Sequence, residues 1–220
     1  MFFSVKLPFK EQEVADYERR RYRGLDQRIV HRREVKILRT MLGLVEDASP
    51  TTPSAYALDA PCGYGRFSAL LLERQARLVS CDLSLAMVER AIRRGDISTV
   101  PMGTACNMTE GLPFQPGVFR LILSMRLFHH LHQSEERLSV LREFARTSAG
   151  WLILSFYLVN PLHRIQRKLR RKIKRSKTRI KMITRREFEE ETEEAGFRVV
   201  RVVPLFRGIH AHHIALLKKA

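Results

Sequence analysis

Short apolar runs alternate with amphipathic stretches through the middle of the chain, and this alternation limits the fold more than any other feature. Strands separated by helices cannot pair through tight hairpins, so the pattern predicts an α/β fold with a parallel sheet covered on both faces. The runs expected as strands are Tyr56–Ala60, Leu78–Asp82, Phe119–Ser124 and Trp151–Tyr157, and the stretches expected as helices are Phe67–Ala76, Ser84–Arg94 and residues 134–148.

The two ends of the chain have different patterns. The N-terminal residues 1–48 form a predicted helical region, with apolar positions at helical spacing such as Ile37, Leu38 and Met41. Near the C-terminus, Thr184 and Glu187 have capping-box spacing at the start of a predicted helix that Gly196 ends. Two further strands, Phe197–Val203 and Ile209–Leu217, have a connection short enough for an antiparallel hairpin. We therefore expect a single domain, divided into residues 1–48, a core at 55–160, a basic helical insertion at 162–181, and a helix with a β-hairpin at 184–220.

Composition excludes several classes of protein. A chain of 220 residues with 45% hydrophobic and 29% charged residues is globular rather than disordered. Its longest apolar run, Trp151–Val159, is too short to cross a bilayer, and the N-terminus lacks the apolar stretch of a signal peptide. The three cysteines at positions 62, 81 and 106 contain no CxxC pair, which fits a reducing compartment. We expect a cytoplasmic protein with no metal site.

A glycine loop follows the first predicted strand. The segment LDAPCGYGRF places Asp59 at the strand end and Gly63 and Gly65 in the turn before the next helix, where an open α/β sheet binds its ligand. A second acid, Asp82, ends the following strand and is placed to accept hydrogen bonds from a ribose. The spacing of the two acids predicts a nucleotide-type ligand.

Charge separates two classes of nucleotide. A dinucleotide would bring an anionic pyrophosphate to a loop that holds Asp59, and the third glycine of a GxGxxG motif is replaced by Ser68. S-adenosylmethionine brings an ammonium and a sulfonium, which a nearby carboxylate attracts. The pair of acids therefore favours S-adenosylmethionine.

Three segments carry a family resemblance: LDAPCGYGRF, CDLSLAMVERA and NMTEGLPFQPGVFRLILSMRLFHHL. In them the chain resembles the class I S-adenosylmethionine-dependent methyltransferases of the type 11, or UbiE-like, group. The resemblance implies a three-layer Rossmann-like fold with a seven-stranded, mostly parallel sheet and an antiparallel last strand. It also implies a cofactor site, in which the methionine end lies at the glycine loop, Asp82 holds the ribose, and three side chains lie near the adenine. Its residues are Asp59, Pro61, Gly63, Gly65, Asp82, Leu83, Met87 and Asn107.

Candidate residues for the acceptor side follow the later strands. His129 and His130 come after the predicted strand Phe119–Ser124, where an imidazole able to titrate near neutral pH would serve as a general base or would only cap a helix. Tyr157 ends the next strand, and Tyr17 lies in the basic N-terminal region; either would bind the acceptor or serve a structural role. The segment HAHH at 210–213 has no third metal ligand at an evident spacing.

One segment carries most of the charge. Residues 162–181 hold eleven Lys and Arg and no acid, against a net charge of +17 for the chain. Their apolar positions fall at helical spacing, so the segment is a solvated helix, a helix on an anionic membrane surface, or a phosphate-binding patch for RNA. The sequence thus predicts a methyltransferase for a small or lipid-like acceptor, with an RNA methyltransferase and a catalytically silent cofactor-binding or adaptor protein as alternatives. A position at the inner face of the membrane is a further alternative to a free cytoplasmic one.

Overall fold

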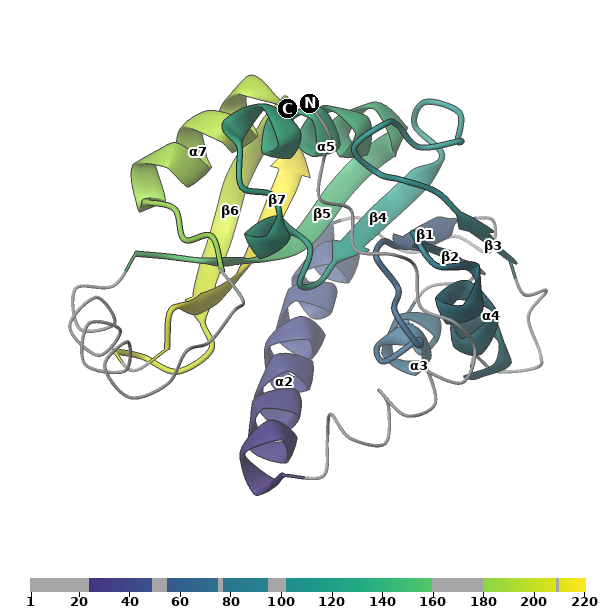
Figure 1. Ribbon diagram of the computed structural model, residues 1–220, viewed down its shortest axis with the longest axis horizontal. Coiled ribbons are helices and arrows are strands. Elements are labelled where there is room, and N and C mark those ends of the chain that lie inside the picture. Colours follow the sequence, from purple (N-terminus) through teal and green to yellow (C-terminus); the bar gives the residue numbers. More distant parts are fainter. Residues whose placement is uncertain (1–23, 49–54, 75–76, 95–101, 160–179, 209) are drawn as a thin grey trace.

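The computed structural model describes residues 24–48, 55–74, 77–94, 102–159, 180–208 and 210–220. At its centre is a seven-stranded sheet with the strand order β3-β2-β1-β4-β5-β7-β6 (Figure 1). Strand β7 is antiparallel to β5 and β6, and the other pairs are parallel, as predicted. The strands are β1 (Tyr56–Asp59), β2 (Arg77–Asp82), β3 (Met102–Ala105), β4 (Phe119–Ser124), β5 (Ser148–Tyr157), β6 (Phe197–Pro204) and β7 (His212–Lys219).

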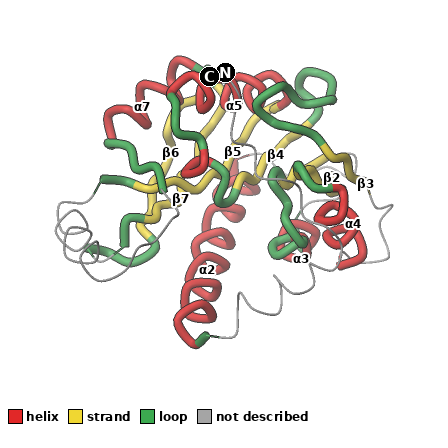
Figure 2. Tube along the Cα trace, viewed as in Figure 1, coloured by secondary structure: helices red, strands yellow, loops and turns green. Residues whose placement is uncertain are grey.

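Helices cover both faces of the sheet, which gives three layers (Figure 2). The helices are α2 (Leu25–Ala48), α3 (Ser68–Leu72), α4 (Leu85–Arg94), α5 (Ser134–Thr147), α7 (Arg185–Glu194) and the short 3-10 helix η1 (Phe128–His130). One buried cluster joins the sheet to α5 and α7 through Phe144 and Phe188, and a second joins its other face to α2 and α3 through Met41 and Leu71. The predicted fold class is therefore confirmed.

Helix α2 packs through the apolar stripe that the sequence predicted. Ile37, Leu38 and Met41 are buried against residues of β4, β5 and β7. The guanidinium of Arg120, in β4, donates a hydrogen bond of 3.2 Å to the carbonyl of Val45 near the C-terminal end of this helix. Arg120 thus fixes α2 to the sheet.

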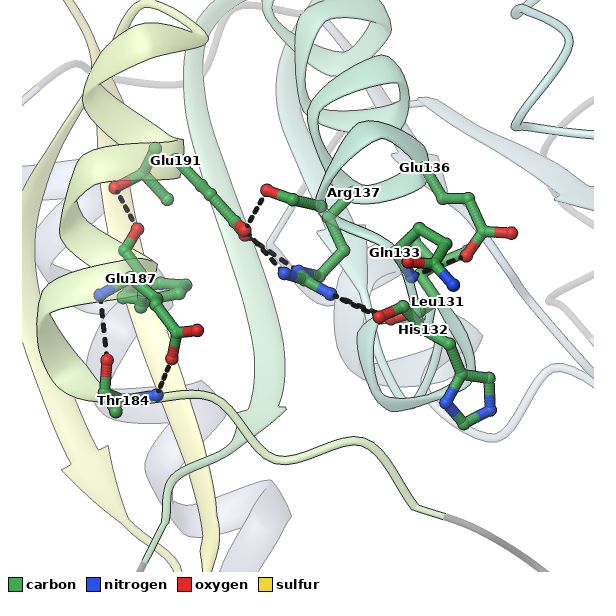
Figure 3. Close-up of polar contacts among 11 residues, drawn as sticks. Leu131, His132, Gln133, Glu136, Arg137, Thr184, Glu187 and Glu191 are labelled. Carbon is green, nitrogen blue, oxygen red and sulfur yellow. Dashed lines mark hydrogen bonds and ion pairs between the residues drawn. The ribbon is translucent and has the colours of Figure 1, made fainter.

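Figure 3 shows how α7 begins and how it meets α5. The capping box of α7 is confirmed, because the Thr184 hydroxyl accepts from the Glu187 amide at 3.1 Å and the Thr184 amide donates to Glu187 at 2.6 Å. The cap of α5 is Gln133, and Ser134 is the first helical residue. The Ser134 hydroxyl donates to Glu191 of α7 at 2.6 Å and so forms a contact between the two helices.

Several predicted boundaries differ from the observed ones. The residues of strand β3 were not identified in the sequence, because MGTA has no apolar alternation and the strand lies at the sheet edge. Helix α3 is shorter than the predicted Phe67–Ala76, and residues 75–76 lie outside the described part. Strand β7 begins at His212, whereas its predicted start, residue 209, lies outside the described residues.

The strand order sets the position of the ligand crevice. Strand β1 lies between β2 and β4, so the sequential order of the strands reverses at β1. The amide of Ala60 donates to the carbonyl of Leu123 at 2.9 Å, which keeps the ends of β1 and β4 together. Connections that leave these strand ends toward opposite faces open a crevice at the carboxyl edge of the sheet.

Candidate functional site

The glycine loop occupies the crevice beyond β1. Gly63 and Gly65 have φ angles of +52° and +76°, a region that side chains with a Cβ rarely adopt. A Cβ on Gly65 would also lie 2.7 Å from the Cα of Ala91 in α4, so the loop packs directly on that helix backbone. Pro61, at the predicted family position, follows a cis peptide bond. The loop is therefore a close-fitting turn that exposes backbone rather than side chains.

Asp59 is a buried carboxylate with an unsatisfied oxygen. Its side chain is 1% exposed, and Oδ2 has no hydrogen-bond partner within the described residues. Burial, with the nearby charge of Asp82, raises the pKa of Asp59 to about 8, while the charge of Arg66 acts in the opposite direction. A carboxyl group held in this way gains most from a cationic ligand, because such a ligand restores its ionised form.

Asp82 joins the glycine loop to β2. Its Oδ2 accepts a hydrogen bond of 2.9 Å from the Gly63 amide, and its Oδ1 accepts one of 3.1 Å from the Ser84 amide. Burial raises the pKa of Asp82, and these amides act against the rise. The two predicted acids thus lie at the ends of neighbouring strands on either side of one loop.

The residues predicted for the adenine lie beyond β2 and β3 but differ in exposure. Leu83 is 37% exposed, whereas Met87 is 3% exposed and packs against Tyr64. The Asn107 side-chain oxygen accepts from the Thr109 amide at 3.2 Å and from its hydroxyl at 2.8 Å. The role of these three side chains at an adenine remains a prediction, and Leu83 is the most exposed of the three.

An aromatic group lies on the acceptor side of the edge. The rings of His129 and His130, in η1, have centroids 4.1 Å apart, and His129 meets Tyr157 edge-to-face at 5.0 Å. Tyr157 in turn stacks on His212 at 4.8 Å. His129 is buried and His130 is exposed, so His130 is the one of the pair that faces solvent. The structure thus brings together three of the four predicted catalytic and acceptor residues.

The remaining predictions fall on undescribed parts of the chain. Tyr17 and most of the basic segment 162–181 lie outside the described residues. At its described end, the Lys181 amide donates to the His129 carbonyl at 3.0 Å, and outside the segment the Val159 amide donates to the Ile183 carbonyl at 2.9 Å. Among the residues the structure describes, no group of three or more His, Cys, Asp and Glu side chains is placed to hold a metal ion.

Sequence reasoning missed a polar cluster beneath this edge. Glu34 of α2 is fully buried and pairs with Arg66 of the glycine loop and Arg126 after β4. The ring of His212 lies close by, with its Nδ1 at 3.9 Å from Glu34 Oε1. One signal was present: Glu34 stands four residues before Leu38 and seven before Met41, on the apolar stripe of α2.

The central part of the chain matches a known protein family. Residues 57–149 match the protein family described as "Methyltransferase domain", and this range holds the glycine loop, both acids and the histidine turn. Residues 57–149 therefore resemble a methyltransferase domain, and the chain has the fold of the class I S-adenosylmethionine-dependent methyltransferases. The predicted resemblance to class I methyltransferases and the predicted donor, S-adenosylmethionine, are confirmed, and the type 11, or UbiE-like, group remains a prediction.

Solved structures and one curated protein resemble the chain. The magnesium protoporphyrin IX methyltransferase of Synechocystis with bound SAH matches with a TM-score of 0.74 and 17% identity, over 96% of this chain and 100% of that one. A TehB-like methyltransferase of Corynebacterium glutamicum matches with a TM-score of 0.61 and 16% identity, over 96% and 100% of the two chains. A probable tRNA methyltransferase 9B of Mus musculus is 30% identical over 106 residues, which are 48% of this chain. The match covers 22% of that relative's length.

Proposed function

We propose that the protein transfers a methyl group from S-adenosylmethionine to a small-molecule or lipid-like acceptor. The observation that carries the proposal is the unsatisfied buried carboxyl of Asp59 beside the Asp82-bound glycine loop. This pair fits a donor that has a cationic amino-acid end and a ribose. Solved structures with the same fold include a magnesium protoporphyrin IX methyltransferase and a geranyl diphosphate methyltransferase. The substrates in both names are small molecules.

The donor side of the site needs binding groups rather than catalytic ones. S-adenosylmethionine, when bound, supplies a methyl group already activated by a positive sulfur. Asp59 and the backbone at Gly63 and Gly65 would hold its amino-acid end, and Asp82 would hold the ribose. Fixing the donor relative to the acceptor supplies much of the rate of an in-line displacement.

The acceptor side contributes orientation and a proton acceptor. Tyr157, at the end of β5, and His129, in η1, lie in contact, and they would form the wall against which the acceptor packs. An imidazole nitrogen of His130 would take a proton from an acceptor hydroxyl or amine. In this proposal His130 acts only for acceptors that lose a proton during transfer.

Isothermal titration of the purified protein with S-adenosylmethionine tests the donor site. We expect micromolar binding, and Asp82→Ala should weaken it at least tenfold, because it removes both the ribose acceptor and the anchor of the Gly63 amide. Asp47→Ala, at an exposed aspartate near the end of α2, is the matched control and should bind normally. A folded wild-type protein without measurable binding would refute the proposal.

A labelling experiment tests the acceptor class. The protein is incubated with methyl-labelled donor and fractionated cell extract, and the label is followed into lipids, small metabolites, RNA and protein. We expect label in the lipid or small-metabolite fraction, with a loss of transfer in His130→Ala for an acceptor that must lose a proton. Donor binding without transfer to any fraction would favour a catalytically silent protein.

One observation favours RNA as a second candidate acceptor. The relative from Mus musculus is named a probable tRNA methyltransferase, and the sequence of residues 162–181 contains eleven basic residues. This alternative predicts RNA binding that falls steeply with salt and is lost when several basic residues between Arg167 and Arg175 become Ser. Label in the RNA fraction together with that salt dependence would establish it in place of the first candidate.

A membrane location is tested separately. Within the described ranges no helix has both the length and the apolar character needed to cross a bilayer. The cationic segment 162–181 remains a proposed contact for anionic lipid surfaces. Co-sedimentation with phosphatidylglycerol vesicles, but not with phosphatidylcholine vesicles, would support peripheral attachment.

A further inference from the structure

Glu34 is a carboxylate buried in the middle of α2, where it meets two arginines from the carboxyl edge of the sheet. Its side chain has no exposed area. Oε1 accepts a hydrogen bond of 2.8 Å from Arg126, and Oε2 accepts one from Arg66. The arginine side chains are themselves only 21% and 10% exposed. Three charges are thus fixed together in a poorly solvated place, where electrostatic effects are strong.

Both arginines belong to segments that follow strands at the carboxyl edge of the sheet. Arg66 directly follows Gly65, and its charge acts on Asp59, whose pKa it lowers against the effect of burial. Arg126 lies two residues beyond the end of β4, and its amide donates to the Ser155 hydroxyl at 2.7 Å. Its φ angle of +67° places it in a left-handed turn. Glu34 therefore links α2 to the segments that follow β1 and β4.

The balance of charge matters because the donor is a cation at sulfur. Two arginines and one glutamate leave a single positive charge in the cluster, and without Glu34 there would be two. The neighbouring His212 adds little, because burial and then the charge of Arg126 lower its pKa well below the usual value. The cluster as built limits the repulsion that a sulfonium near Asp59 would experience.

We propose that Glu34 is a positioning residue that holds Arg66 and Arg126 and offsets their charge, so that the site accepts the cationic donor rather than favouring its neutral by-product. This inference rests on the proposed function, since it assumes that S-adenosylmethionine binds beside Asp59. It assigns to α2, which lies outside the residues 57–149 of the matched domain, a part in selecting the donor.

The test compares dissociation constants for S-adenosylmethionine and S-adenosylhomocysteine, which differ in the charged methyl-sulfonium. In Glu34→Gln we expect S-adenosylmethionine binding to weaken relative to S-adenosylhomocysteine binding, by roughly threefold to tenfold in the ratio of the two constants. In Arg126→Gln, which removes one positive charge, the ratio should shift in the opposite direction. Glu46→Gln is the matched control on the same helix, because Glu46 pairs with Arg74 at 2.7 Å in a more exposed place, and it should leave the ratio unchanged.

Each outcome separates this inference from the proposed function. A loss of fold or of loop order weakens both ligands equally, so only the ratio reports the charge. Thermal unfolding without ligand shows whether Glu34→Gln folds. If it does not fold, the opposite shift of the ratio in Arg126→Gln tests the role of the charge cluster. Wild-type protein that binds neither ligand would refute the proposed function, whereas normal binding with unchanged ratios in both variants would overturn only the role of Glu34.

Discussion

The backbone amide of Gly63 donates a hydrogen bond of 2.9 Å to Oδ2 of Asp82, and this contact joins the glycine loop after β1 to the end of β2. The same carboxylate accepts from the Ser84 amide at 3.1 Å, so it also fixes the turn before α4. One side chain therefore shapes both loops around the proposed ribose. The binding site and local stability should respond together when it is changed.

We expect Asp82→Asn to weaken both hydrogen bonds without removing the side chain. An amide offers one oxygen in place of two charged ones, so the free energy of unfolding should fall by about 1 to 2 kcal/mol. Donor binding should weaken as well, but less than in Asp82→Ala. Urea unfolding and titration calorimetry measure the two effects, and an unchanged stability would mean that the Gly63 contact contributes nothing to the fold.

The two loop glycines should respond differently to an added methyl group. Both have positive φ angles, so alanine at either position should cost about 1 to 2 kcal/mol from backbone strain. At Gly63 a Cβ meets nothing within 4 Å, whereas at Gly65 it would lie 2.7 Å from the Ala91 backbone. We expect Gly65→Ala to lose at least roughly 1 kcal/mol more than Gly63→Ala. Equal losses in thermal unfolding would show that the loop can move away from α4.

Asp59 should make the stability of the ligand-free protein depend on pH. Its pKa is about 8 in the folded protein against 3.8 as the ordinary value, so between these limits the folded state binds more protons than the unfolded state. The contribution of this group to stability is therefore fully present below pH 3.8 and is lost as pH rises through 8. The expected slope reaches at most about 1.4 kcal/mol per pH unit.

Asp59→Asn provides the measurement of that slope. The variant lacks the titrating group. Between pH 5 and pH 8 the free energy of unfolding of the wild type should therefore fall relative to that of the variant. Donor binding should release a proton from the wild type at pH 7, because a cation favours the ionised carboxylate. Titration in buffers of different ionisation enthalpy detects this proton, and its absence would contradict a protonated Asp59.

Part of the site could be predicted from sequence because it is local. Asp59, Gly63 and Gly65 lie within seven residues, and Asp82 follows one strand later, so strand periodicity alone places them at one edge. The short edge strand β3 could not be recognised in the same way, since four half-exposed residues have too little apolar pattern. Local spacing thus identified the donor loop but not every strand beside it.

The charged cluster depended on long-range contacts. Glu34 meets partners 32 and 92 residues further along the chain, and no spacing rule connects such distances. The apolar stripe of α2 shows that Glu34 is buried, and a buried carboxylate needs a partner, but the sequence offers forty Lys and Arg as candidates. Only the packing of α2 on the sheet selects Arg66 and Arg126.

The turn that carries the histidines should depend on a buried ion pair between α5 and α7. Arg137 donates to Glu191 at 2.8 and 2.6 Å, and its remaining donors reach the carbonyls of Leu131 and His132 at 3.1 and 3.2 Å (Figure 3). The paired side chains are only 3% and 8% exposed. Arg137→Met leaves Glu191 buried without its partner, and we expect a loss of about 3 to 5 kcal/mol.

The same two helices supply the control for this last prediction. Arg142 and Glu194 also pair across α5 and α7, at 2.6 Å, but both are more than half exposed. Solvent screening limits such a pair to less than about 1 kcal/mol, so Arg142→Met should change urea unfolding little. The double variant Arg137→Met/Glu191→Met should recover much of the loss of the single one, because it removes both charges together. Comparable losses of unfolding free energy in Arg137→Met and Arg142→Met would show that the buried pair stabilises the protein no more than the exposed one.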